Sequence, residues 1–145
     1  MARYATTIDS NLAPDDAFAY MASFDNALEW DPGVVDAKRL DSGELRKGSA
    51  FQVVSKFAGR RVPLRYEITT FEPGRKVVLE AWNNTFGSVD TITVVPVGSG
   101  CSVTYDATLV PKGAFRLANP LMQLVFGRVG KAADASLRIH LNRPH

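Results

Sequence analysis

Residues 61–82 read RVPLRYEITTFEPGRKVVLEAW, and this stretch decides the fold class. Apolar and polar side chains alternate from Arg61 to Phe71, and they alternate again from Lys76 to Trp82. A period of two is typical of a strand that buries one face. The intervening Glu72-Pro73-Gly74 is a strong turn signal. The stretch therefore predicts two antiparallel strands joined as a hairpin.

The same alternation continues on both sides of this hairpin. Short strands are predicted along most of the chain, over residues 3–10, 34–40, 50–58, 61–71, 76–82, 86–95 and 101–110. Turn signals such as Asp41-Ser42-Gly43 and Gly98-Ser99-Gly100 separate them. Because no helical period interrupts the strands from residue 34 onward, an antiparallel meander is expected.

Helical patterns flank the meander. Pro14-Asp15-Asp16 suits the start of one short helix, and Asp31-Pro32-Gly33 ends a second one over residues 24–30. Beyond Asn119-Pro120 the pattern predicts one amphipathic helix of about 22 residues, to about residue 141. The residues expected on its apolar face are Leu121, Val125, Val129, Ala132, Ala133, Ser136 and Ile139.

These elements predict a curved sheet wrapped around the C-terminal helix, since each has one apolar face to bury. A single helix about 10 Å wide is too narrow to cover the concave face of seven strands. Small side chains such as Ala132, Ala133 and Ser136 would leave further room. We therefore expect an apolar cavity between the sheet and the helix.

Composition narrows the functional classes. The 145 residues suit one domain, residues 1–145. A balance of 17 basic and 15 acidic residues argues against a nucleic-acid partner, and 46% hydrophobic residues argue against disorder. No apolar run reaches the about 18 residues of a membrane span, and no secretory signal is recognisable. We therefore expect a cytoplasmic protein without stable membrane insertion.

Cysteine and histidine usage argues against a metal centre. The single Cys101 excludes an internal disulfide and a thiolate metal cluster, and it suits a small buried hydrophobe. His140 and His145 lack an acidic ligand cluster nearby, so we expect no metal site and no cofactor.

Several short segments, in a fixed order, span nearly the whole chain. They are residues 30–34 (WDPGV), Gly48, 66–75 (YEITTFEPGR), 88–96 (SVDTITVVP), Thr104-Tyr105, 112–117 (KGAFRL) and Pro120-Leu121. In this order they resemble the START-like helix-grip (SRPBCC) superfamily, within its polyketide cyclase/dehydrase and lipid-transport group. The resemblance implies an α+β helix-grip domain over residues 1–145. Its seven-stranded curved antiparallel sheet would wrap around a long C-terminal helix, with two short helices after the first strand. Because the superfamily includes lipid carriers, hormone receptors and cyclases, the resemblance does not select an activity.

Asp90 is the leading candidate for chemistry. Strand parity places it on the apolar face with Phe86 and Ile92, where loss of hydration would raise its pKa and suit a general acid or base. Tyr105 or Tyr66, also on inward faces, would be its partner. In the alternative interpretation, Asp90 only bonds to backbone or to an arginine, and the tyrosines only pack in the core.

The first expected function is binding or transport of a small hydrophobic or amphipathic molecule, such as a lipid, polyketide or aromatic metabolite. The alternative is a cofactor-independent polyketide cyclase or dehydratase that uses Asp90 with Tyr105 or Tyr66. The residues expected to line the cavity are Trp30, Phe51, Val53, Leu64, Tyr66, Leu79, Phe86, Asp90, Ile92, Tyr105, Leu121, Val125 and Val129.

Two further points stay open in the sequence. Trp30 either closes the cavity mouth, as the resemblance implies, or is a structural plug. Residues 111–145 contain six basic residues and one acidic residue, so this face is either solvated or in contact with an anionic surface. The sequence is compatible with a monomer or a homodimer.

Overall fold

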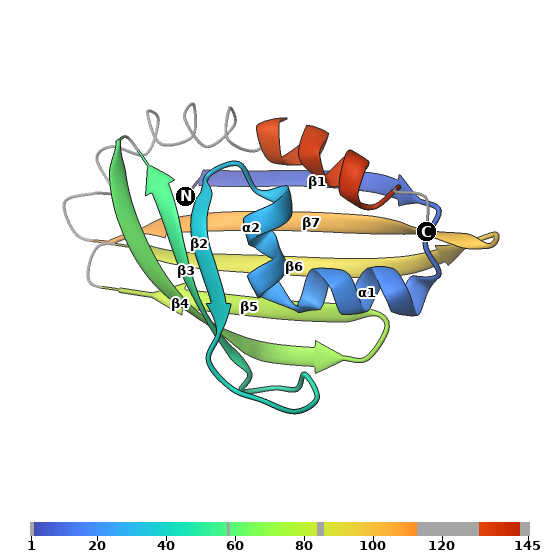
Figure 1. Cartoon of the computed structure of the whole chain (residues 1–145), viewed down its shortest axis with the longest axis horizontal. Helices are drawn as coiled ribbons and strands as arrows, with labels where there is room; N and C mark the ends of the chain where they lie inside the picture. The colour runs from blue at the N-terminus through green and yellow to red at the C-terminus, as the bar shows by residue number, and fades with distance from the viewer. Residues whose placement is uncertain (1, 58, 84–85, 113–130, 143–145) are drawn as a thin grey trace.

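A computed structural model describes residues 2–57, 59–83, 86–112 and 131–142 (Figure 1). Strands form most of the described chain, and short helices follow the first strand. The elements in order are β1 (Ala2–Ser10), α1 (Pro14–Ala22), η1 (Phe24–Asn26), α2 (Ala27–Trp30), β2 (Val34–Arg39), β3 (Ala50–Phe57), β4 (Arg60–Glu72), β5 (Lys76–Trp82), β6 (Phe86–Val97) and β7 (Gly100–Pro111). Residues 131–140 form a further helix near the C-terminus.

The seven strands form one antiparallel sheet in the order β1-β7-β6-β5-β4-β3-β2. From β2 to β7 each strand pairs with the next one along the chain, as expected of a meander. β1 pairs with β7, the last strand, in a register that sets Ile8 opposite Val103. The predicted seven-stranded antiparallel architecture is therefore confirmed.

The sheet is strongly curved, and its helices lie on the concave side (Figure 1). The pairing register shifts between Val34 and Asp36 in β2 and between Ile68 and Thr70 in β4. Such bulges bend a strand and increase its twist. They lie in the half of the sheet farthest from β1, where the strands turn most sharply in Figure 1.

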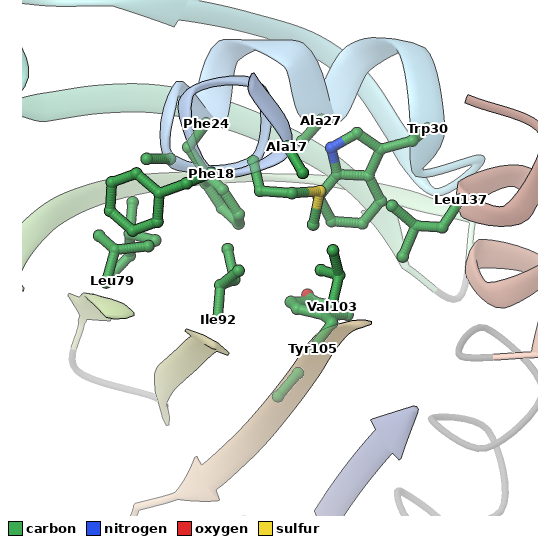
Figure 2. Close-up of a cluster of buried hydrophobic side chains, with 14 of the residues drawn as sticks. Ala17, Phe18, Phe24, Ala27, Trp30, Leu79, Ile92, Val103, Tyr105 and Leu137 are labelled. Atoms are coloured by element: carbon green, nitrogen blue, oxygen red, sulfur yellow. The ribbon is translucent and has the colours of Figure 1, made fainter. Parts of the chain in front are cut away.

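The core lies between the concave face and the helices. From Ser88 to Val94 in β6 and from Cys101 to Ala107 in β7, every second side chain is buried, as the period of two predicts. Figure 2 shows side chains of the short helices facing those of the sheet, with Phe18, Phe24 and Trp30 opposite Ile92 and Tyr105. The short helices therefore cover a large part of the apolar surface that the sequence assigned to the C-terminal helix.

Among the described residues, the buried row of the C-terminal helix matches the predicted apolar face only at Ala133. Residues 131–140 are helical, as expected, and Ala133, Leu137 and Leu141 are buried. Ile139 is 65% exposed and Ala132 is also exposed, so placing them on the apolar face was wrong. The buried residues recur every four positions, which forms one continuous row on a helix. Leu121, Val125 and Val129 lie outside the described residues.

Contacts with β1 hold this helix in place. Asp134 accepts a hydrogen bond from the Thr6 hydroxyl, and Ser10 Oγ donates to the Leu141 carbonyl at 2.6 Å. The Asn142 side chain bridges back to the Asp9 carbonyl at 3.0 Å. The helix therefore runs along β1, which is consistent with Figure 1.

Candidate functional site

Four polar side chains form a continuous hydrogen-bonded chain on the buried face of the sheet. Tyr66 Oη donates to Ser88 Oγ at 2.9 Å, and Ser88 Oγ donates to Asp90 Oδ1 at 3.0 Å. Tyr105 Oη donates to the other carboxylate oxygen, Asp90 Oδ2, at 2.9 Å. All four residues are buried, and Asp90 is 2% exposed. We call this set the Asp90 cluster.

The register of the strands explains how Tyr66 and Tyr105, which are 39 positions apart in the sequence, come together in one cluster. Ser88 and Asp90 lie two apart on β6, so their side chains share a face. Asp90 lies opposite Ala107, and Ile92 lies opposite Tyr105, so the Tyr105 side chain reaches Asp90 diagonally. On the other side, Ser88 lies opposite Ala81 of β5. Because Ala81 is small, the side chain of Tyr66 on β4 can extend over it to Ser88.

The apolar environment changes the proton affinity of the cluster. Burial raises the pKa of Asp90 to about 7, because the ionised carboxylate loses hydration. The hydrogen bonds from Tyr105 and Ser88 stabilise the ionised form and oppose this shift, whereas the charges of Asp31 and Asp106 add to it. The pKa values of Tyr66 and Tyr105 are raised well above their usual range, first by burial and then by the charge of Asp90.

Aromatic side chains from η1 and α2 pack over the two tyrosines. The Phe24 ring lies 4.9 Å from that of Tyr66, and the Trp30 ring lies 5.2 Å from that of Tyr105, both edge to face. Trp30 is fully buried, and its Nε1 has no hydrogen-bond partner within the described part of the chain. Figure 2 shows this nitrogen on the side of α1 and α2, with the six-membered ring toward Tyr105. Trp30 therefore presents an apolar edge to the cluster.

The inward orientation predicted for Asp90, Tyr66 and Tyr105 is confirmed by their burial and shared contacts. The other predicted lining residues that the structure describes lie on the same apolar side, namely Trp30, Phe51, Val53, Leu64, Leu79, Phe86 and Ile92. All of them are buried except Phe86, which is half-buried. Their role in holding a ligand stays a prediction, as does that of Leu121, Val125 and Val129.

Sequence reasoning missed Ser88 and Phe24. Ser88 could have been found, because it lies two residues before Asp90 on the same strand face. Phe24 gave no such signal, since its contact with Tyr66 depends on how η1 packs against a strand more than 40 residues away.

Several other titratable side chains take structural positions. Cys101 is buried, as expected of a small hydrophobe. Glu29 accepts a hydrogen bond from Tyr20, and Asp31 accepts one from the Gly33 amide at 2.9 Å. His140 Nδ1 lies 2.8 Å from the Ser136 carbonyl. Among the described residues there is no group of three or more potential metal ligands, and no described helix has the length and apolarity to span a membrane.

Comparison with known proteins agrees with this fold. A family model described as polyketide cyclase / dehydrase and lipid transport matches residues 1–140. A search of curated proteins found no match. A START superfamily protein from Mycobacterium smegmatis is similar in structure, with a TM-score of 0.78 and 10% sequence identity, over 97% of this chain and 97% of that chain.

Two further solved structures extend this likeness. The STAR-related lipid transfer protein from Xanthomonas axonopodis has a TM-score of 0.70 and 18% identity, over 96% of this chain and 85% of that fragment. The di-domain ARO/CYC StfQ from the steffimycin biosynthetic pathway has a TM-score of 0.69 and 16% identity, over 94% of this chain and 50% of that chain. These similarities establish the α+β helix-grip fold.

Proposed function

Because the chain belongs to the polyketide cyclase/dehydrase and lipid transport family, we propose that it binds a small hydrophobic or amphipathic molecule between its concave sheet and C-terminal helix. Family and fold together indicate a START-like ligand-binding domain. The ligand class would be a lipid, a polyketide or an aromatic metabolite. On this proposal the protein acts in the cytoplasm as a monomer or homodimer, without inserting into a membrane.

The Asp90 cluster is the observation that supports this proposal most directly. Ligand sites typically combine apolar walls with a few polar groups that fix orientation. Here apolar side chains such as Phe51, Val53 and Ile92 supply the walls, and one polar chain links three strands. Burial of apolar ligand surface would contribute about 25 cal/mol per Å², while the cluster would orient the ligand's polar group.

Native mass spectrometry of protein purified from its own host tests the proposal. We expect an additional mass of a small molecule that disappears when the same sample is denatured. A protein that is free of any such adduct, and that also fails to bind the probe described next, would contradict the proposal.

A neutral fluorescent probe, N-phenyl-1-naphthylamine, supplies the second test. We expect a saturable rise in its fluorescence with the wild-type protein. Ala107→Leu adds volume at the buried position opposite Asp90, and it should weaken probe binding. Ala5→Leu makes the same change at an exposed position of β1, and it should bind as the wild type does. Far-UV circular dichroism would verify that both variants are folded.

A second function is favoured by one specific feature, the contact between Tyr105 and Asp90. A general base is most effective when its pKa lies near the working pH. Asp90 has a pKa of about 7 and lies 2.9 Å from a tyrosine hydroxyl. This pair could remove a proton next to a ligand carbonyl and return it elsewhere, as a cofactor-independent cyclase or dehydratase requires. Tyr66 would act at one remove, through Ser88.

Deuterium exchange separates catalysis from binding alone. The probe is 4-phenylbutan-2-one in heavy water, with exchange of the protons next to its carbonyl followed by NMR. An enzyme of this type should accelerate exchange over buffer, and Asp90→Asn should abolish the acceleration. Asp36→Asn, on an exposed part of β2, should retain it. Exchange at the buffer rate with bound probe would leave binding as the function.

A further inference from the structure

The direction of the hydrogen bonds in the Asp90 cluster determines whether a ligand group must donate or accept a hydrogen bond there. An ionised carboxylate only accepts hydrogen bonds, so Ser88 and Tyr105 must both donate to it. Ser88 has a single hydroxyl proton, which is used in this way, so Tyr66 must donate to Ser88. All three hydroxyl protons are therefore committed within the cluster.

The lone pairs that remain in the cluster are acceptors. Each carboxylate oxygen has room for a second hydrogen bond, and the phenolic oxygens of Tyr66 and Tyr105 each have an acceptor site. These atoms are enclosed by apolar side chains, including the edges of Phe24 and Trp30. A ligand group that could only accept hydrogen bonds would find no donor in the ionised cluster.

The charged side chains in the described part of the interior are acidic. Within the described part of the chain, the buried polar and charged side chains are Ser10, Ser49, Ser88 and Asp90, so none of them is basic. The half-buried Asp31 adds a second acidic group whose charge is felt by Asp90, Tyr66 and Tyr105. Its Oδ1 is held by the Gly33 amide at 2.9 Å.

We propose that the polar group of the ligand is a hydrogen-bond donor, a hydroxyl or a protonated amine, attached to an apolar body, and that carboxylates and phosphates are rejected. This inference rests on the binding function proposed above and specifies its ligand class. A hydroxyl or ammonium proton satisfies the acceptors of Asp90 and Tyr105. An anionic group brings like charge next to Asp90 in an apolar environment, where such repulsion is weakly screened.

Three probes with one apolar body test the proposal, namely 4-phenylbutan-1-ol, 4-phenylbutan-1-amine and 4-phenylbutanoate. Each would displace N-phenyl-1-naphthylamine at pH 8.0, where Asp90 is mostly ionised. Among the residues that the structure describes, the ionisable or charged neighbours of Asp90 are Tyr66 on β4, Tyr105 and Asp106 on β7, and Asp31 between α2 and β2.

We expect the alcohol and the amine to bind at least about tenfold more tightly than the carboxylate at pH 8.0. To bind the carboxylate probe, Asp90 must first take up a proton. Because pH 8.0 is one unit above the Asp90 pKa of about 7, this protonation makes binding about tenfold less favourable. A carboxylate that binds within about threefold of the alcohol, or a displaceable probe that neither the alcohol nor the amine displaces, would overturn the headgroup inference.

Two variants that each remove one negative charge test whether Asp90 causes the discrimination against the carboxylate probe. Asp90→Asn keeps the size of the side chain but supplies two donors and no charge, so the discrimination against the carboxylate should fall below about threefold. Asp36→Asn removes a charge from the exposed side of β2 and should keep the full discrimination. Unchanged discrimination in Asp90→Asn would show that Asp90 does not select the headgroup. If the fluorescent probe itself fails to bind, the binding function fails, and the inference fails with it.

Discussion

Asp90 combines high burial with one hydrogen-bond partner on each carboxylate oxygen. Both carboxylate oxygens accept a hydroxyl proton, which offsets part of the cost of taking a charge out of water. The remaining cost appears as the raised pKa of about 7. At neutral pH, Asp90 therefore exchanges between its protonated, neutral form and its ionised form.

The pH dependence of stability should report Asp90 directly. In the folded protein Asp90 holds its proton up to about pH 7, whereas in the unfolded chain it releases it near its ordinary value of 3.8. Between these values the folded state binds more protons, so the free energy of unfolding falls as pH rises from about 4 to about 7. The total loss would be on the order of 4 kcal/mol.

Chemical denaturation at pH 4.5, 6.0 and 7.5 measures this loss. Asp90→Asn should remove most of the decrease, leaving the smaller part that comes from the raised pKa of Asp31. Asp36→Asn is the matched control and should keep the wild-type slope. An equal slope in Asp90→Asn and wild type would show that Asp90 does not titrate in this range.

Removal of the Tyr105 hydroxyl should raise the pKa of Asp90 further. In Tyr105→Phe the carboxylate loses the hydrogen bond at 2.9 Å that favours its ionised form. The pKa would be followed by carbon-13 NMR of the aspartate side-chain carbons. Tyr4→Phe, at a half-buried position on β1, should leave the Asp90 titration unchanged. A pKa that stays the same or falls in Tyr105→Phe would contradict the hydrogen-bond assignment.

One row of buried side chains determines which face of the C-terminal helix packs against the core. Ala133, Leu137 and Leu141 are buried against the core, and Figure 2 places Leu137 beside Trp30. Ile139 is equally apolar, but it lies two positions from Leu137 and therefore on nearly the opposite side of the helix. The helix thus depends on packing at the buried row and little on its exposed apolar residue.

A pair of alanine substitutions tests this orientation. Leu137→Ala removes a side chain that is 0% exposed and should lower the free energy of unfolding by about 2–5 kcal/mol. Ile139→Ala acts at a side chain that is 65% exposed and should change it by less than about 0.5 kcal/mol. Urea denaturation monitored by circular dichroism gives both values. A larger loss for Ile139→Ala than for Leu137→Ala would reverse the assigned face.

At the scale of the whole molecule, the sheet brings the first strand of the chain next to its last strand and to the C-terminal helix. β1 pairs with β7, and the C-terminal helix contacts β1 through Ser10 and Asp134. The concave face is thus enclosed by elements from the first and last parts of the sequence. A ligand held between the sheet and this helix would stabilise the assembled fold over the unfolded chain.

Ligand-dependent stabilisation follows from this closure. At about 100 times its dissociation constant, 4-phenylbutan-1-ol should add about 2.7 kcal/mol to the free energy of unfolding. The shift of the urea midpoint measures this increase. Ala107→Leu should show a smaller shift at the same alcohol concentration, and Ala5→Leu should show the wild-type shift. An equal shift for Ala107→Leu and wild type would place the binding site away from the cluster.

The local alternation of apolar and polar residues explains why the strands and the inward-facing side chains could be predicted from the sequence. The alternation around Tyr66, Asp90 and Tyr105 predicted both the strands and the inward direction of these side chains, because successive residues of a strand point to opposite faces. The seven antiparallel strands follow from the same pattern together with the turn residues between them.

The contacts between the side chains of the site could not be predicted from the sequence and became apparent only in the folded structure. The bridge from Tyr66 through Ser88 depends on the register of β4, β5 and β6, and the Phe24 and Trp30 rings reach the cluster only because α2 and η1 pack on the sheet. The burial of Leu137 in preference to Ile139 likewise depends on which row meets β1 and the core. Periodicity specifies which face of an element is apolar, whereas register and packing between distant segments determine which side chains meet.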